Sequence, residues 1–290
     1  MKKSFGILVI VFITLASFSA DKPAWKLFNS KGKEIKYKRM IADLADADMV
    51  FFGELHNNPI AHWLELEIMK SLYESKGSDL IVGAEMFETD NQLLLDEYLS
   101  GLVSDSRFEV EARLWKNYKT DYKPLVTFAR DSGLSFVADN VPRRYASLVA
   151  QRGFEILDSL SVEAKQFLPP LPIPYDPEVK CYKDMLDMMG NSKMPHSGEN
   201  FPKAQALKDA TMAHFIYKNW KRGKIFLHFN GSYHSDRKEG IVWYLRNLDS
   251  TLVIRNLTIK EVSGTLVPDS ASKTLADYII VVPEDMTKTY

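Results

Sequence analysis

The chain has 290 residues, a formal net charge of −1 and a hydrophobic content of 46%. This length and balance suit one large globular domain with a substantial buried core. The near-neutral charge argues against a nucleic-acid partner.

The start of the chain has the pattern of a secretory signal peptide. Lys2 and Lys3 give a positive start, residues 5–18 are almost wholly apolar, and small residues follow at Ser19 and Ala20. The apolar stretch is shorter than the ~20 residues that a spanning helix needs, and an uncleaved anchor is the alternative. We therefore expect an exported protein, in the periplasm or at the cell surface of a bacterium. No cysteine lies near the expected cleavage point, so no lipid-anchor cysteine is expected.

Residues 1–20 are the expected signal peptide, and residues 21–290 are expected to form a single α/β domain. Short apolar runs alternate with helical stretches along this domain. Such runs are typical of strands buried on both faces. The pattern predicts a mostly parallel central sheet covered by helices on both faces. The expected strands are Met49–Phe52, Leu80–Val82, Leu134–Val137, Ile225–Leu227, Leu252–Val262 and Tyr278–Val282.

A helix is expected directly after the first strand. Asn58 is suited to cap its start and Pro59 to occupy its first position, and the helical pattern continues to about Ser75. His62 and Glu65 fall on its apolar side, three residues apart, so they are neighbours on the helix surface. We expect either a buried structural pair or a contact to a ligand.

The segment from about 159 to 202 interrupts the alternation of strands and helices. Residues 169–177 hold five of the 13 prolines of the chain, which rules out helix there. Methionines then gather over 185–194. We expect a helical, Pro- and Met-rich insertion, either a cap over a site or a packing segment. Cys181, the only cysteine, is expected to be a packing residue.

Polar side chains follow four of the expected strands at the points where the chain leaves the sheet. The carboxyl ends of parallel strands meet at one edge of a sheet, where ligands usually bind. The sequence therefore predicts a polar site at this edge. The side chains that would form it are Glu54, His56, Glu85, Glu88, Asp139, Asn140, Asn230 and His234.

The spacing Gly-x-x-His occurs twice, as Gly53–His56 and Gly231–His234. Fewer than one occurrence is expected by chance, and both follow an apolar strand. Glycine at such an exit permits a tight turn and a close approach of the backbone to a ligand. Glu54 and His56 lie two residues apart, so they project to the same side of an extended segment.

Taken in order, these motifs resemble the Tiki/TraB superfamily, which also includes erythromycin esterases and ChaN-like haem-uptake proteins. The ChaN-like branch is the most similar, and the resemblance covers nearly all of the expected mature chain. No single motif is specific, but their order along the chain is. The matching segments are Gly53–His56 with His62, Glu85–Phe87, Trp115 with Tyr118–Pro124, Asn140–Arg143, Gln205 with Asp209–Ala213, and Gly231–His234.

The resemblance implies an exported haem- or iron-binding protein that takes part in haem or iron uptake. Members of the ChaN-like branch are typically surface lipoproteins proposed to bind haem, with tyrosine as the iron ligand. The implied partner is a small molecule, haem or iron, and haem held between two chains would suit a homodimer. Carried over onto the matching motifs, the cofactor-binding residues are Glu54, His56, His62, Glu85, Arg143, Asp209 and Tyr233.

The alternative is a metal-dependent hydrolase, a protease or an esterase of the Tiki or erythromycin-esterase type. A divalent transition metal would be held by Glu54, His56, Glu85 and His234, and would activate a bound water. Glu88 would take the proton, with Glu54 and His56 as further catalytic residues. A metal-free esterase would use His56 as its base. A third possibility is a binding protein that kept the fold without its chemistry.

Overall fold

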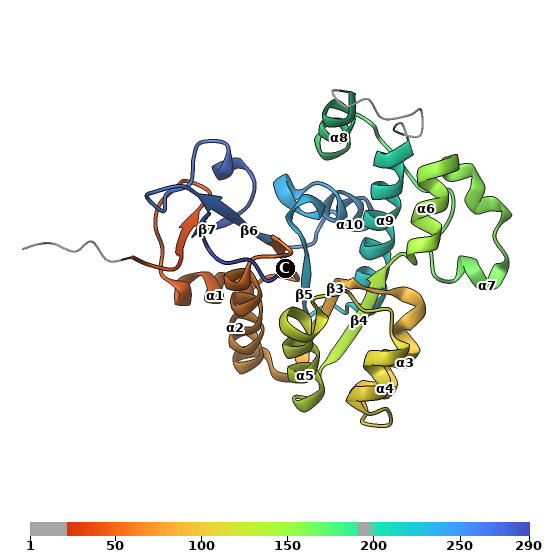
Figure 1. Ribbon diagram of the computed structural model, residues 1–290, viewed down its shortest axis with the longest axis horizontal. Coiled ribbons are helices and arrows are strands. Elements are labelled where there is room, and N and C mark those ends of the chain that lie inside the picture. Colours follow the sequence, from red (N-terminus) through yellow and green to blue (C-terminus); the bar gives the residue numbers. More distant parts are fainter. Residues whose placement is uncertain (1–21, 191–197, 199) are drawn as a thin grey trace, which may run out of the picture.

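The computed structural model describes residues 22–190, 198 and 200–290, which form a seven-stranded sheet flanked by helices (Figure 1). The expected signal peptide lies outside the described residues. The strand order is β1-β7-β6-β2-β5-β3-β4, with β1 antiparallel to β7 and every other neighbouring pair parallel. The strands are β1 (Lys26–Asn29), β2 (Met49–Glu54), β3 (Leu80–Glu88), β4 (Ser135–Asn140), β5 (Ile225–Gly231), β6 (Ile254–Val262) and β7 (Tyr278–Pro283).

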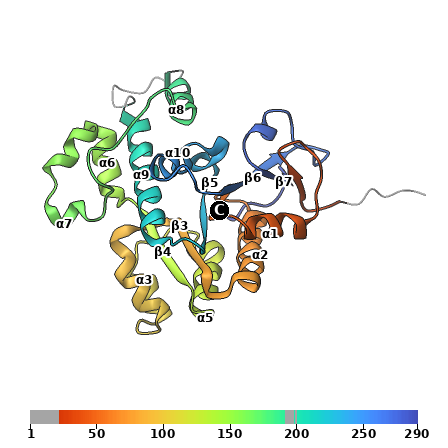
Figure 2. The same ribbon diagram turned by 180° about the vertical axis from the view of Figure 1, so that it is seen from behind.

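Helices cover both faces of the sheet, which confirms the predicted fold class (Figure 2). One hydrophobic core lies under α1 (Tyr37–Ala45), α2 (Pro59–Lys76), α3 (Gln92–Leu99), α4 (Asp105–Glu111) and α5 (Lys123–Asp131). The other lies under α6 (Arg143–Arg152), α9 (Phe201–Asn219) and α10 (Ile241–Leu248). Because both faces are covered, the inner strands bury every side chain, and this explains why they read as continuous apolar runs.

The register of the central strands brings the predicted motifs together. β2 pairs with β5 so that Glu54 lies opposite Gly231, and β5 also pairs with β3. The two Gly-x-x-His motifs therefore leave neighbouring strands at the same edge. This edge carries the polar residues described below.

Helix α2 begins as its sequence predicts. The Asn58 side chain accepts hydrogen bonds from the backbone N–H groups of Ile60 and Ala61, at 3.0 and 3.1 Å. Pro59 occupies the first turn, where no backbone N–H is needed. His62 and Glu65 are both buried on this helix. The cap thus fixes the phase of α2 and aims these two side chains at the sheet.

The segment 159–202 contains the short helices α7 (Val162–Lys165) and α8 (Lys180–Gly190), with the proline run between them irregular. It packs against the second core: the Tyr244 hydroxyl donates to the carbonyl of Pro174 at 2.7 Å. Cys181 is buried, in agreement with a packing role. Met194 lies outside the described residues. That the segment is an insertion stays a prediction.

The structure differs from the expected elements at their ends. β1 was not predicted, because its four residues form a short edge strand with little apolar pattern. β3, β4 and β5 extend further than their apolar runs, so Glu85, Asp139 and Asn230 lie within strands rather than after them. Among the described residues, no helix has the length and apolar character required to cross a membrane.

Candidate functional site

A pocket with a volume of about 520 Å³ opens at the carboxyl ends of β2, β3 and β5. The four predicted metal ligands, Glu54, His56, Glu85 and His234, all line it. Their roles as ligands stay predictions, but their common location is a property of the sheet register. The other lining residues are Leu55, Asn57, Met185, Gln205, Lys208, Gly231, Ser232, Tyr233 and Tyr290.

Glu54 and His56 form one carboxylate–imidazole pair of the pocket. His56 Nδ1 lies 2.5 Å from Glu54 Oε1, which also accepts a hydrogen bond from the Tyr122 hydroxyl at 2.8 Å. Burial, reinforced by the charge of Glu65, raises the pKa of Glu54 to about 8. Burial favours the neutral form of His56, but its hydrogen bond to Glu54 and the charge of Glu85 outweigh burial and raise the pKa of His56. The pair therefore holds a proton strongly.

Gly231 brings the second motif against this pair. A methyl group at this position would lie 2.8 Å from His56 Nε2 and 2.9 Å from His56 Cε1, closer than real Cβ contacts. The glycine of the motif is thus required by the close approach of β5 to the imidazole. The backbone N–H of Gly231 also donates to Glu85 Oε2 at 2.8 Å.

His234 lies between two carboxylates on the other side of the pocket. Its Nδ1 is 2.5 Å from Asp209 Oδ1, and its Nε2 is 3.2 Å from Glu85 Oε1. Burial opposes a charge on this ring, but Glu85 and Asp209 together raise the pKa of His234 to about 9. Although burial opposes ionisation of Glu85, the charge of His234 holds the pKa of Glu85 well below its usual range. The pocket therefore contains a buried imidazolium–carboxylate pair.

Asp209 and Tyr182 lie behind His234, on the side away from the pocket. The Tyr182 hydroxyl donates to Asp209 Oδ2 at 2.8 Å, and burial raises the pKa of Asp209. Asp209 does not line the pocket, so the structure places it behind His234 as an orienting group. The Gln205 amide nitrogen lies 3.0 Å from His234 Nδ1.

His62 and Glu65 form a buried layer behind Glu54. His62 Nδ1 lies 3.1 Å from Glu65 Oε2 and 3.4 Å from Glu54 Oε2. The His62–Glu65 pair that the helix spacing predicted is therefore present. Neither residue lines the pocket, so a direct contact of His62 with a haem in this pocket is not supported.

Several predicted polar residues lie outside the pocket. Glu88 is paired with Arg113 at 3.0 Å, and this charge partner removes it as a spare base near the pocket. Asp139 faces the buried ring of His228 at 3.1 Å, while Asn140 donates from its side chain to the Glu85 carbonyl. The prediction that all four strand ends supply one site was wrong for β4, because its polar residues are used inside the sheet.

Arg143 lines an adjoining pocket of about 370 Å³, which shares Gln205 and Lys208 with the first. Tyr233 lines the first pocket and is 47% exposed. Lys208 and Tyr290 are lining residues that sequence reasoning missed. The place of Lys208 in α9, one residue before Asp209, offered a signal, whereas nothing in the sequence near Tyr290 indicated a contact with residues 54–57.

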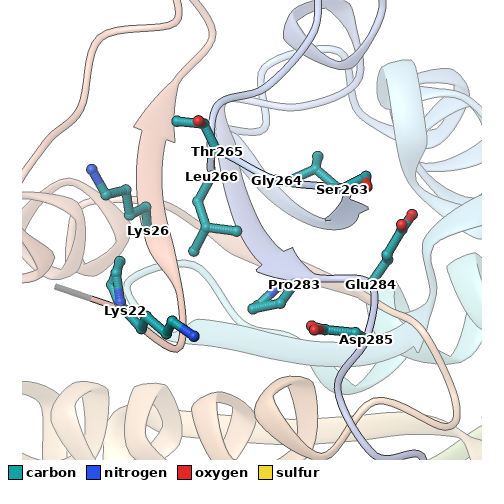
Figure 3. A pocket seen from close by; sticks show the side chains of 11 residues that line it. Lys22, Lys26, Ser263, Gly264, Thr265, Leu266, Pro283, Glu284 and Asp285 are labelled. Carbon is teal, nitrogen blue, oxygen red and sulfur yellow. The ribbon is translucent and has the colours of Figure 1, made fainter. Parts of the chain in front are cut away.

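A larger cavity, of about 580 Å³, lies over β1, β6 and β7 and shares no lining residue with the two pockets above (Figure 3). Lys22 and Lys26 line one side, and Glu284 and Asp285 line the other. The charges are mixed, and none of the described lining residues is a histidine or a cysteine. The chemistry of the molecule is therefore concentrated in the smaller pocket between β2, β3 and β5.

With this geometry established, comparison with known proteins identifies the family. Residues 40–245 match the model of a family described as haem-binding uptake, Tiki superfamily, ChaN. The matched range includes Glu54, His56, Glu85 and His234. The chain belongs to this family. The ChaN resemblance inferred from the sequence motifs is thereby confirmed.

Solved structures share the fold of this ChaN family member. The structure described as cofacial haem binding to ChaN of Campylobacter jejuni superimposes with a TM-score of 0.67 at 20% identity, covering 89% of this chain and 96% of the other. An erythromycin esterase mutant in its open conformation gives a TM-score of 0.53 at 12% identity, covering 91% and 98%. At these identities the likeness shows the fold alone.

A curated relative matches part of the chain. Protein RETICULATA-RELATED 5, chloroplastic, of Arabidopsis thaliana is 27% identical over 139 residues. The match covers 46% of this chain and only 19% of the relative. It therefore carries no conclusion about the activity of the chain.

Proposed function

We propose that this member of the ChaN family is an exported bacterial protein that binds haem in the pocket between β2, β3 and β5 and serves haem or iron uptake. Family membership supports haem as the ligand class. The signal-peptide pattern at the start of the sequence supports export. The role in uptake follows from combining the two.

The mixed chemistry of the pocket is the observation that carries this proposal. Two phenols, Tyr233 and Tyr290, line it, and a tyrosinate is an established axial ligand of haem iron. Lys208 and, in the adjoining pocket, Arg143 supply positive charge suited to the two carboxylates of haem. The donor set therefore fits haem: a phenol for the iron and basic residues for the propionates.

The pocket also has apolar walls for the ring of a haem. Leu55 and Met185 line the first pocket, and Phe201, which is 47% exposed, lines the second. These three side chains would contact the faces and edge of the haem ring. A haem that projects from so open a site would be covered by a second chain, and a homodimer belongs to the proposal.

A titration of the purified protein with haemin tests the proposal. We expect a shifted Soret band that saturates at or below one haem per chain. Tyr290→Phe or Tyr233→Phe should alter the band, because one of the two phenols is lost as an iron ligand. Tyr217→Phe, on α9 but outside the lining of both pockets, is the matched control. A titration without any Soret shift in excess haemin would reject haem binding.

The basic residues give a second arm of the same experiment. Lys208→Ala should weaken haem binding about tenfold or more, because a charge-assisted hydrogen bond to a propionate is lost. Lys218→Ala, at an exposed position on the same helix, should leave binding unchanged. Equal effects of the two substitutions would mean that Lys208 acts only through the general charge of the surface.

A hydrolase remains the second candidate, and the Glu54–His56 pair favours it. With Nδ1 held by Glu54, the imidazole of His56 directs Nε2 toward Gly231 at the pocket wall, in the arrangement of a general base. A divalent metal held by Glu54, His56, Glu85 and His234 would supply the alternative activation of water. Hydrolysis of a chromogenic ester by the haem-free protein, lost in His56→Asn, would support this candidate.

A further inference from the structure

Behind the pocket, α2 inserts two side chains against the back of Glu54. One ligand-type atom from each of Glu54, His62 and Glu65 can be chosen so that all three lie within 4.8 Å of one another. All three residues are buried. We call these three residues the inner triad. Only Glu54 belongs both to the inner triad and to the lining of the pocket.

The orientation of His62 is that of a metal ligand. Its Nε2 lies 3.0 Å from the backbone carbonyl of His56, which accepts a hydrogen bond from the N–H at this position. When the proton is on Nε2 and Nδ1 is deprotonated, the lone pair of Nδ1 is directed at Glu54 and Glu65. Histidines that ligate metals are usually held in this way, by a hydrogen bond from the other ring nitrogen to a carbonyl or a carboxylate.

The carboxylates of the triad are short of partners. Glu54 Oε2 and Glu65 Oε1 are fully buried and accept no hydrogen bond. Asp121 adds a third buried carboxylate, 3.4 Å from His62 Nε2. Within the described residues, no lysine or arginine forms an ion pair with any of these three acids. Buried carboxylates are normally paired with a cation or coordinate a metal. Here three acids face only two imidazole rings, those of His56 and His62, so the cluster is short of positive charge.

We propose that the inner triad binds a divalent transition-metal ion, of which Zn²⁺ is the representative, as a site distinct from the pocket. One imidazole nitrogen and two carboxylate groups form a ligand set that such ions accept. The ion would supply the missing charge and satisfy the two orphan oxygens. The proposal rests on these side chains and not on haem, so a failure of the proposed function would leave it unaffected.

The ion would also organise the pocket. Glu54 Oε1 contacts His56 Nδ1 at the pocket and accepts a hydrogen bond from the buried Tyr122 hydroxyl. The other oxygen, Oε2, lies 3.4 Å from His62 Nδ1 in the triad. Binding of Oε2 to a metal would therefore fix the carboxylate that orients His56. This makes Glu54 a bridge between a structural ion and the chemistry at the surface.

Zinc binding to chelator-treated protein tests the proposal by isothermal titration calorimetry. We expect one Zn²⁺ per wild-type chain, at least roughly 100-fold weaker binding in Glu65→Gln and in His62→Gln, and a thermal transition raised by zinc only in the wild type. Glu67→Gln, a half-exposed position on the same helix that pairs with Lys70, is the matched control and should bind as the wild type does.

Glu85→Gln separates the triad from the pocket. It alters a residue of the pocket set but none of the triad, so zinc binding should persist. Loss of binding in Glu85→Gln with retention in His62→Gln and Glu65→Gln would overturn the proposal in favour of the pocket. Failure of the wild type to bind zinc would also overturn it, in favour of a proton shared between Glu54 and Glu65.

X-ray absorption at the zinc edge keeps the test independent of variants that fail to fold. The triad offers a single imidazole, whereas the pocket set offers two, His56 and His234. We expect the spectrum of the zinc-loaded wild type to show one imidazole among oxygen ligands. A spectrum with two imidazoles would overturn the assignment.

Discussion

His234 has two carboxylates against its ring, and its charge sets the electrostatics of the pocket. Asp209 fixes Nδ1 and Glu85 fixes Nε2, so both ring nitrogens face acceptors. A doubly protonated ring is the form that satisfies both contacts. The charge of the ring is balanced by Glu85, which lines the same pocket, so Lys208 is the lining residue that would attract haem carboxylates.

We predict that His234 remains protonated well above neutral pH. The pKa of a free histidine is about 6.5, and the pKa of His234 in the folded chain is about 9. The stabilisation from its charge is therefore fully present below about pH 6.5 and is lost as the pH rises through about 9. Histidine NMR resonances of the labelled protein should show one ring that titrates near this value.

Removing a carboxylate tests the cause of this shift. Asp209→Asn should lower the pKa of His234. It should also lower the free energy of unfolding by about 3 kcal/mol, because a buried charge loses its partner. The exposed Asp158→Asn serves as the control and should change neither quantity. An unaltered histidine titration in Asp209→Asn would show that Asp209 does not hold the proton on His234.

At the scale of elements, the exit of β5 shapes the pocket wall. Gly231 lies at the end of β5, pairs with Glu54 on β2 and touches the edge of the His56 ring. Its backbone is not in the left-handed region, so the requirement for glycine is one of space and not of conformation.

Gly231→Ala should therefore displace His56 while leaving the fold intact. The new methyl group would meet the end of a side chain that is partly exposed and able to rotate. We expect the free energy of unfolding to change by about 1 kcal/mol or less, while haem affinity or hydrolysis falls severalfold. Chemical denaturation and the haemin titration measure the two effects, with the exposed Ser250→Ala as the control. A large loss of stability would assign Gly231 to the scaffold instead.

The elements also show where sequence reasoning stops. The apolar runs predicted the central strands, and parallel pairing then placed Glu54, His56, Glu85 and His234 at one edge. Glu88 is not available as a base near the pocket because it pairs with Arg113, a partner that no local sequence pattern specifies. The contact of Tyr290 with the pocket likewise depends on the path of the tail, which docks through the backbone of Thr289 on Asn57.

At the scale of the whole molecule, the proposed export depends on the first residues of the chain. The region 1–20 is expected to direct export and then to be removed. We predict that native material recovered from the cell envelope begins at Ala20 or Asp21. N-terminal sequencing checks this, and a chain without residues 2–20 should remain in the cytoplasm. Native protein that still begins at Met1 would contradict cleavage.

The register of β2 with β5 has a consequence for the order of events during synthesis. Glu54 comes early in the chain and its neighbour Gly231 comes late, yet the pocket exists only when the two strands lie side by side. A polypeptide threaded through a translocation channel with its N-terminus first would therefore expose Glu54 and His56 long before their partners emerge. Such an unfolded chain could not carry bound haem from inside the cell across the membrane. Under the export proposed here, the ligand would be loaded on the far side of the membrane, after the last strands have joined the sheet.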